Sequence, residues 1–187
     1  MSERVSIDLK DGVADVRMIR TDKMNAIDAE MFTALVEAGR TLCAERSVRA
    51  VVLSGEGRAF CAGLDMGSFT AMADGTRDGV AVGGNVFERG SSGANRAQLA
   101  AWIWQEVPVP VIAAVHGVAY GGGLQIALGA DLRIVAPDAR MSVMEIKWGR
   151  NGKFLACPAY KADPPCKNTQ NFQKLEDGTI KIVPKIE

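Results

Sequence analysis

Three consecutive glycines, Gly121 to Gly123, separate an apolar run from a helix-like run, and they limit what this chain can fold into. The run VIAAV (111–115) before them predicts a buried strand, and LQIALGA (124–130) after them predicts a helix. Glycine costs about 1 kcal/mol relative to alanine inside a helix, so the run needs a cause. One cause is tight packing of the helix against a strand. The other is an oxygen atom that approaches the unpartnered first N–H groups of the helix, either from a phosphate or from the oxyanion of a reacting carbonyl.

The order of apolar runs predicts strands that alternate with helices, which favours an α/β layered fold with largely parallel pairing. An Asp-Gly turn at Asp11 and Gly12 predicts a hairpin at the start of the chain. Asp28 is the expected N-cap of a helix that continues to about Glu45. A second helix is expected within 94–107. The expected strands are 5–9, 14–18, 50–55, 111–115, 132–136 and 140–146, and we expect the last four to be buried.

Charge balance, apolar runs and cysteine usage together limit the class of protein that this chain can be. The 187 residues include 22 Lys and Arg and 22 Asp and Glu, a balance that argues against capture of nucleic acid or of an anionic membrane. No apolar run is long enough to span a bilayer, and the first residues lack the apolar stretch of a signal peptide. The four scattered cysteines are expected to be reduced thiols. We therefore expect a globular, cytoplasmic protein.

A second glycine-containing turn, GEGRAFCAGLDM (55–66), follows directly after the strand expected at 50–55. Two N–H groups from separate turns form an oxyanion hole when they point at one spot. The pair RAFCAGLDM and AVHGVAYGGGLQIALGADLRIV resembles the crotonase superfamily, the enoyl-CoA hydratase/isomerase family, and TDKMNAID and ARMSVMEIKWG resemble two further segments of it. The resemblance covers about residues 5–149 in unbroken order. It implies a crotonase-like core, a spiral of ββα repeats.

The resemblance also implies a site for an acyl-CoA thioester. Coenzyme A would be part of that substrate, so no separate cofactor is expected. The family's oxyanion donors correspond to the backbone N–H groups of Leu64 and Gly122, and the two catalytic glutamates of its hydratases correspond to Gln125 and Glu145. The residues implied to contact the coenzyme A portion are Lys23, Ala62, Gly63, Leu64, Asp65, Met66 and Gly121.

Gln125 departs from the hydratase pattern, because an amide does not titrate near neutral pH. Addition of water then lacks one of its two acid–base groups. A shift of a proton from one carbon to another needs only one carboxylate, and Glu145 is the candidate. We therefore favour an enoyl-CoA isomerase-type reaction over full hydration. The alternatives are a weak hydratase, another enolate reaction of this superfamily, and a non-catalytic acyl-CoA-binding or assembly protein.

Other side chains near these motifs are expected to be structural. His116 is the only histidine and lies at a strand-to-turn junction. Cys61 has no second histidine to pair with, so we expect a small buried apolar residue rather than a nucleophile. Trp102 and Trp104 are two apart and do not share a helix face. One is expected in the core, and the other over the acyl pocket or a subunit contact.

The family pattern ends at Gly149, so we predict a crotonase-like domain over 1–149 and an unrelated tail over 150–187. In that tail, GRNGKFLACPAY with the later Cys166 and KNT resembles half of the zinc ribbon of bacterial type IA topoisomerases. Structural zinc needs four ligands, and Cys157 and Cys166 supply only two, so no metal is expected. The tail's lysines favour a nucleic-acid contact only weakly. A solvated β-like or disordered extension is the simpler interpretation.

The core so defined is truncated, because family members continue into a C-terminal helical region that packs on neighbouring subunits. The join to the tail suggests a fusion, a rearranged gene or a chimera. Without that region the core's apolar surface would be left uncovered. We expect a homo-oligomer whose trimeric contacts are incomplete.

Overall fold

A computed structural model describes residues 4–65, 90, 92–143, 145–149, 152–156, 169–174 and 180–183, and from residue 145 onward only their backbone. The chain divides into two compact units, Met1–Met141 and Ser142–Glu187. The first unit begins with β1 (Val5–Lys10), β2 (Val13–Met18), η1 (Thr21–Lys23), α1 (Ala29–Ala44) and β3 (Ala50–Gly55). It continues with α4 (Arg96–Glu106), β4 (Val111–Val115), β5 (Val118–Tyr120), α5 (Gly122–Gly129) and β6 (Leu132–Val135).

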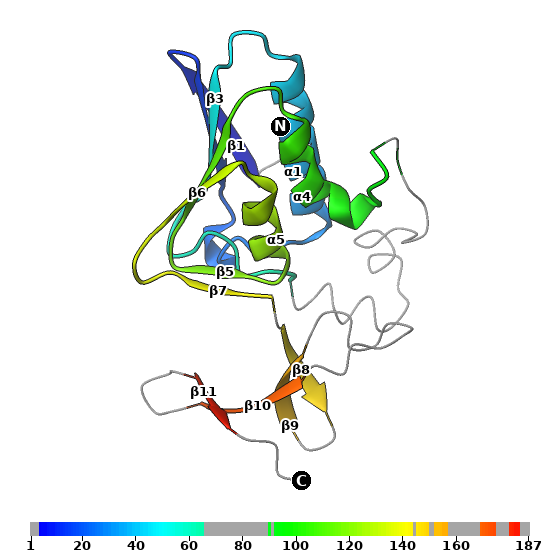
Figure 1. The fold of residues 1–187 in the computed structure, drawn as a ribbon, viewed down its shortest axis with the longest axis vertical. Coiled ribbons are helices and arrows are strands. Elements are labelled where there is room, and N and C mark those ends of the chain that lie inside the picture. The colour runs from blue at the N-terminus through cyan, green and yellow to red at the C-terminus, as the bar shows by residue number, and fades with distance from the viewer. Residues whose placement is uncertain are drawn as a thin grey trace. The chain divides into compact units, whose positions relative to one another are not determined.

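A five-stranded sheet in the order β1-β2-β3-β4-β6 is the centre of the first unit. Only β1 and β2 pair antiparallel, and every other pair in this sheet is parallel. Figure 1 shows α1, α4 and α5 gathered on one side of it. The expected α/β fold with mostly parallel pairing is confirmed.

The first hairpin has the turn that its sequence predicts. Lys10 pairs with Val13, so the loop between them is Asp11 and Gly12 alone. Both loop residues have positive φ, 52° and 82°, as a tight turn between right-twisted strands requires. Glycine and aspartate tolerate this conformation better than most residues.

The core lies where buried residues of neighbouring strands align. Val51 of β3 is opposite Ala14 on one side and Val111 on the other, and all three are fully buried. The helices cover this row with apolar faces. Helix α1 buries residues at helical spacing, Met31, Leu35, Ala38 and Leu42, and α4 buries Ala100, Ile103 and Trp104. Of the two tryptophans in α4, Trp104 is the core residue, and Trp102 is 43% exposed.

Burial of the strand at 132–136 was predicted wrongly. Strand β6 forms, but all four of its residues are exposed, Ile134 by 68%. Ile134 pairs with Ala114 and Leu132 with Ile112, so these two side chains lie on the sheet face opposite the buried row. An apolar run indicates a strand suited to burial, and whether anything covers it depends on other parts of the protein.

The single strand expected at 140–146 is also wrong, because this segment contributes to two strands in different sheets. Strand β7 (Arg140–Ser142) pairs with β5 in a two-stranded sheet. Strand β8 (Glu145–Gly149) belongs instead to the second unit. Arg140 and Met141 are exposed, so the predicted burial of this segment is wrong as well.

The second unit contains a four-stranded antiparallel sheet in the order β11-β10-β9-β8. Its further strands are β9 (Gly152–Ala156), β10 (Thr169–Lys174) and β11 (Ile180–Val183). Residues 145–149, which we predicted with the crotonase-like domain, lie in this unit. The division into domains at 149 stays a prediction.

Candidate active site

The loop at 59–65 runs between two other segments of the first unit and is bonded to both. On one side, Cys61 forms a parallel bridge with Ala119, and its N–H and carbonyl bond Val118 and Tyr120 at 3.0 Å each. On the other side, the N–H of Ala62 donates to the carbonyl of Met24 at 2.9 Å. The loop is therefore held like an extra strand with fixed register.

The hydrogen bonds on either side of Leu64 fix the direction of its backbone N–H and carbonyl groups. Ile27 donates to the carbonyl of Gly63 at 2.8 Å and accepts from the N–H of Asp65 at 2.9 Å. Leu64, between these two bonds, is the bridge partner of Ile27, so its own N–H and carbonyl point to the opposite side. That side is where the loop faces β5 and the start of α5.

The register at Cys61 predicts that Leu64 and Gly122 lie near one another. Cys61 is opposite Ala119, and three residues further along both parallel segments lie Leu64 and Gly122. The segments stay close, since a Cβ atom on Gly63 would lie only 2.7 Å from the carbonyl oxygen of Tyr120. Within the described residues, neither the N–H of Leu64 nor that of Gly122 has an acceptor.

The three glycines of the run differ in what their surroundings require. Gly121 has φ 50° and ψ −113°, a conformation outside the regions that residues with a side chain favour. A Cβ atom on Gly123 would lie 2.5 Å from the carbonyl oxygen of Cys61, so that glycine permits tight helix-to-strand packing. A Cβ atom on Gly122 would meet only the end of the Ile27 side chain, at 2.9 Å. Tight packing therefore accounts for Gly123, and the approach of an oxygen atom to Gly122 stays a prediction.

The start of α5 adds a favourable electrostatic environment. Gly122 is the first residue of this helix, whose first intrahelical bond runs from the N–H of Gln125 to the carbonyl of Gly121. The aligned peptide dipoles place partial positive charge at this end, which favours an approaching oxygen anion. Gln125 lies one turn after Gly122, on the same face of the helix, and its side chain is exposed.

A groove of about 460 Å³ lies between α4 and α5. Gln125 and Leu128 line it from α5, and Gln98, Trp102 and Gln105 line it from α4. Trp104 takes no part, because its ring is buried and its Nε1 donates to the carbonyl of Ala100 at 3.0 Å. The groove therefore pairs an exposed indole with amide side chains.

The residues predicted to contact coenzyme A are partly brought together. Ala62, Gly63, Leu64 and Asp65 lie in the loop beside Gly121, and the carboxylate of Asp65 accepts from Arg20 at 2.7 Å. Lys23 ends the short helix η1 with an exposed side chain. Met66 falls outside the described residues. Contact of these residues with coenzyme A stays a prediction.

Glu145 lies in β8, where its backbone pairs with that of Ala156. It belongs to the second unit. Its assignment as the proton carrier therefore stays a prediction. Within the described residues, no three His, Cys, Asp or Glu side chains are grouped to hold a metal ion. Cys157 and Cys166 fall outside them, so the expected lack of zinc also stays a prediction.

Cys61 and His116 both have structural environments. The thiol of Cys61 is fully buried and donates to the carbonyl of Asn25 at 3.1 Å. Burial raises the pKa of this thiol to about 12, so it stays protonated and is no nucleophile. His116 Nε2 donates to the carbonyl oxygen of Gly57 at 2.9 Å, which ties the end of β4 to the loop before the site.

Arg20 and Asn25 lie next to the candidate site, and the sequence patterns did not indicate either of them. Asn25 is fully buried, and its amide donates to the carbonyls of Glu56 and Ala59, at 3.0 and 2.8 Å. A lone asparagine between apolar residues in MNAI was the available signal. Arg20 binds Asp65, and no local pattern connects residues so far apart in the chain.

Comparison with known proteins gives one consistent result. The family model described as enoyl-CoA hydratase/isomerase matches residues 8–162, and so continues past residue 149, where the sequence pattern had placed its end. A probable enoyl-CoA hydratase of Mycobacterium leprae is 32% identical over 148 residues, covering 78% of this chain and 53% of that one. A probable enoyl-CoA hydratase of Bacillus subtilis is 33% identical over 134 residues, covering 72% and 47%.

The solved structures agree. An enoyl-CoA hydratase/carnithine racemase from Magnetospirillum magneticum matches with a TM-score of 0.61 and 29% identity. The match covers 74% of this chain and 48% of that one. The chain thus spans about half the length of the curated relatives and solved structures that it matches. Among the helices that the structure describes, none has the length and apolar character needed to cross a membrane.

Proposed function

Since the chain belongs to the enoyl-CoA hydratase/isomerase family, we propose that it binds an acyl-CoA thioester with the thioester oxygen at the N–H groups of Leu64 and Gly122. The observation that carries the proposal is that neither N–H group has an acceptor among the described residues. Coenzyme A enters as part of the substrate, with no separate cofactor. Loss of one donor in such a site typically costs about 3–4 kcal/mol of transition-state stabilisation.

The chemistry that such a pair supports is formation of an enolate. A base removes the proton from the carbon next to the thioester, and the electron pair moves onto the thioester oxygen. The two N–H groups and the positive end of α5 stabilise the negative charge there. Returning the proton to the γ-carbon moves the double bond and regenerates the base. We assign this proton transfer to Glu145.

The finer proposal is that isomerisation prevails over hydration. Its support is Gln125, which lies one helical turn from Gly122 and lines the groove between α4 and α5. An amide orients a water molecule or a substrate oxygen, but it does not act as a general acid or base near neutral pH. The names of the relatives refer to hydratases, so this preference depends on the side chain alone.

A direct assay tests both levels of the proposal. The protein is mixed separately with a 3-enoyl-CoA and a 2-enoyl-CoA, and absorbance of the conjugated thioester is followed. We expect the first to gain conjugation and the second to change slowly. Glu145→Gln should lower the rate by about 100-fold or more. Glu37→Gln, at an exposed position of α1, is the matched control and should leave the rate unchanged.

Gln125→Glu provides the complementary measurement. A second carboxylate should raise hydration of the 2-enoyl-CoA relative to isomerisation of the 3-enoyl-CoA. Hydration that is already fast with Gln125 present, and that does not rise in the variant, contradicts the isomerase preference. An unchanged rate in Glu145→Gln contradicts the role of Glu145.

Gln125 also favours a second candidate function, the binding of acyl-CoA without turnover. Binding measured by calorimetry, with no reaction of either substrate, would establish it. Assembly into a homo-oligomer is also part of the proposal, and sedimentation velocity measures it. The resemblance of 150–187 to half of a zinc ribbon stays a prediction, for which elemental analysis is the test.

A further inference from the structure

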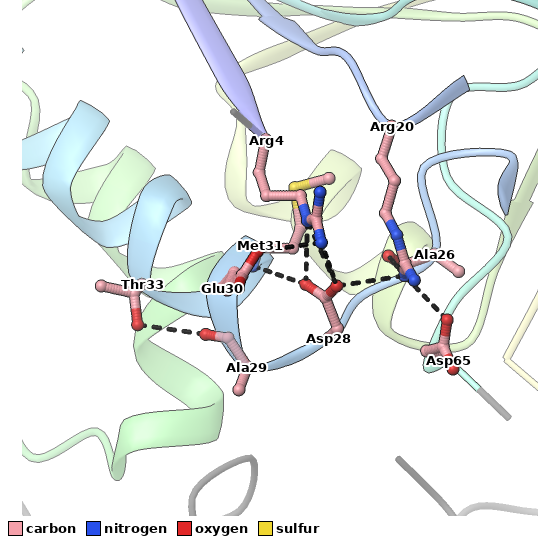
Figure 2. Close-up of polar contacts among 9 residues, drawn as sticks. All are labelled: Arg4, Arg20, Ala26, Asp28, Ala29, Glu30, Met31, Thr33 and Asp65. Atoms are coloured by element: carbon pink, nitrogen blue, oxygen red, sulfur yellow. Dashed lines mark hydrogen bonds and ion pairs between the residues drawn. The ribbon is translucent and has the colours of Figure 1, made fainter. Parts of the chain in front are cut away.

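Five charged side chains form a cluster beside the candidate site: Arg4, Arg20, Asp28, Glu30 and Asp65. Figure 2 shows both arginines directed at Asp28, with Arg20 placed between Asp28 and Asp65. The side chains of Arg20 and Asp65 are only 14% and 17% exposed. A pair this sheltered is screened less by salt than a surface pair, so its geometry matters more.

One nitrogen of Arg20 makes three contacts. Its Nη1 donates to the carboxylate of Asp65 at 2.7 Å and to the carbonyl of Ala26 at 2.9 Å. The same atom lies 3.4 Å from the carboxylate of Asp28. The guanidinium thus connects the segment before α1 to the loop at 59–65.

Two of the contacts of Arg20 are with residues next to the Ile27–Leu64 bridge. Ala26 immediately precedes Ile27, and Asp65 immediately follows Leu64. Ile27 and Leu64 are the bridge partners whose bonds turn the Leu64 N–H toward the start of α5. Arg20 therefore holds both segments at the residues adjoining that bridge.

We propose that Arg20 is a positioning residue, which through Asp65 fixes the direction in which Leu64 presents its N–H group. The inference rests on the proposed function, because it matters only if an oxygen binds there. The bridge between Leu64 and Ile27 is bonded by two hydrogen bonds. The peptide before Leu64 is held by the bond from the Ile27 N–H to the Gly63 carbonyl, and the Arg20–Asp65 contact restrains the residue on the other side of Leu64. An N–H group misplaced by about 1 Å loses much of its effect, on the order of 100-fold in rate.

Arg4 provides a matched control within the same cluster. Its Nε and Nη2 contact Asp28 at 3.2 and 3.0 Å, and its Nη2 contacts Glu30 at 2.9 Å. No contact of Arg4 with Asp65 appears among the described residues. Arg4→Gln therefore removes a comparable ion pair from the same cluster without releasing the loop.

The experiment uses the full chain and a chromophoric thioester, 4-(dimethylamino)cinnamoyl-CoA. Hydrogen bonds to the thioester oxygen polarise this conjugated system and shift its absorption to longer wavelength. Affinity and spectral shift are measured together for the wild type, Arg20→Gln, Asp65→Ala, the double variant and Arg4→Gln. The shift reports donors at the oxygen, and affinity is supplied mostly by the rest of the molecule.

We expect Arg20→Gln and Asp65→Ala each to lose most of the spectral shift while the dissociation constant changes by less than about tenfold. The double variant should lose little more than Arg20→Gln alone, since Asp65→Ala then removes a contact that is already lost. Arg4→Gln should keep the full shift. In turnover, kcat should fall and KM should stay nearly constant. Arg20→Lys keeps the positive charge but lacks the planar fork of guanidinium donors. It should show part of the spectral shift that Arg20→Gln loses.

Each other outcome has a distinct meaning. A full shift in Asp65→Ala with a lost shift in Arg20→Gln shows that Arg20 acts as a charge, which overturns the inference. Equal losses in Arg4→Gln and Arg20→Gln show a general effect of the cluster on folding, and also overturn it. A wild type that binds without any shift refutes the oxyanion site itself, and with it the inference. If Arg20→Gln fails to fold by near-UV circular dichroism, Asp65→Ala decides the question.

Discussion

Gly121, Gly122 and Gly123 follow one another in the chain, yet at Gly122 an added Cβ atom would meet only the end of another side chain. A Cβ atom at Gly122 would touch the end of the Ile27 side chain, whereas at Gly123 it would press on the backbone of Cys61. Backbone cannot move aside as cheaply as the tip of a side chain. Adjacent residues of one type therefore have unequal tolerance to the same substitution.

This difference predicts the outcome of two substitutions. Gly123→Ala should destabilise the fold by about 1–3 kcal/mol, because the added methyl group overpacks a buried contact. Gly122→Ala should cost less than about 1 kcal/mol, since alanine's better helix propensity offsets the small shift of Ile27. Urea unfolding followed by circular dichroism measures both. Equal losses in the two variants would contradict the packing at Gly123.

The buried thiol of Cys61 predicts a dependence on pH. Its pKa is raised to about 12 in the folded protein by burial, above the value in the unfolded chain. Its contribution to stability is therefore fully present below the unfolded pKa, about 8.5, and is lost as the pH rises from there toward the folded value. Relative to Cys61→Ala, the wild type should lose stability across this alkaline window.

Alkylation gives a second readout of the same thiol. At about pH 8, iodoacetamide should modify the exposed Cys43 and leave Cys61 untouched, as mapped by peptide mass spectrometry. In urea both should react. Modification of Cys61 at the rate of Cys43 without denaturant would show that the loop at 59–65 opens readily.

Helix α1 depends on its first residues, where charge and backbone needs coincide. The carboxylate of Asp28 accepts from the N–H of Met31 at 2.8 Å and also pairs with Arg4. Helix α4 uses a capping box, in which Asn95 and Gln98 each accept from the other's backbone N–H. Both helix starts follow local rules, and Asp28 was correctly predicted as the N-cap from sequence.

Removal of this cap should be measurable. Asp28→Ala should lower the free energy of unfolding by about 1–2 kcal/mol, because the N–H of Met31 loses its acceptor and two arginines lose a partner. Glu30→Ala, whose side chain is 69% exposed, should cost less than about 0.5 kcal/mol. Urea denaturation compares the two. Similar losses would mean that the charge, and not the cap, stabilises α1.

Local chemistry explains which elements the sequence could predict. The hairpin over 5–18, α1, β3 and β4 all carry signals within a few residues, and all were predicted correctly. Burial of β6 and the course of 140–146 were not, because both depend on which partners the strands find. In the candidate site, the resemblance named Leu64 and Gly122 as donors, and that assignment stays a prediction. The Arg20–Asp65 pair joins residues 45 apart, so no periodicity or spacing could reveal it.

The order of strands in the main sheet predicts where the first unit is most protected. Strand β3 lies between β2 and β4 at the centre, whereas β6 is at an edge of the sheet as described. Amides of β3 should exchange with deuterium most slowly, and those of β6 faster, because a central strand opens only when the sheet does. Hydrogen-exchange mass spectrometry at low and high protein concentration measures this. Amides of β6 as slow as those of β3 at every concentration would mean that this edge is covered.

Trp102 is half exposed beside Gln125, and Trp104 in the same helix is sealed from solvent. Indole emission responds to the polarity around the ring, so a molecule that enters the groove will change the light from one of these tryptophans and spare the other. With Trp148 replaced by phenylalanine, the chain carries its own optical reporter of occupancy, and titrations can be followed without any attached dye.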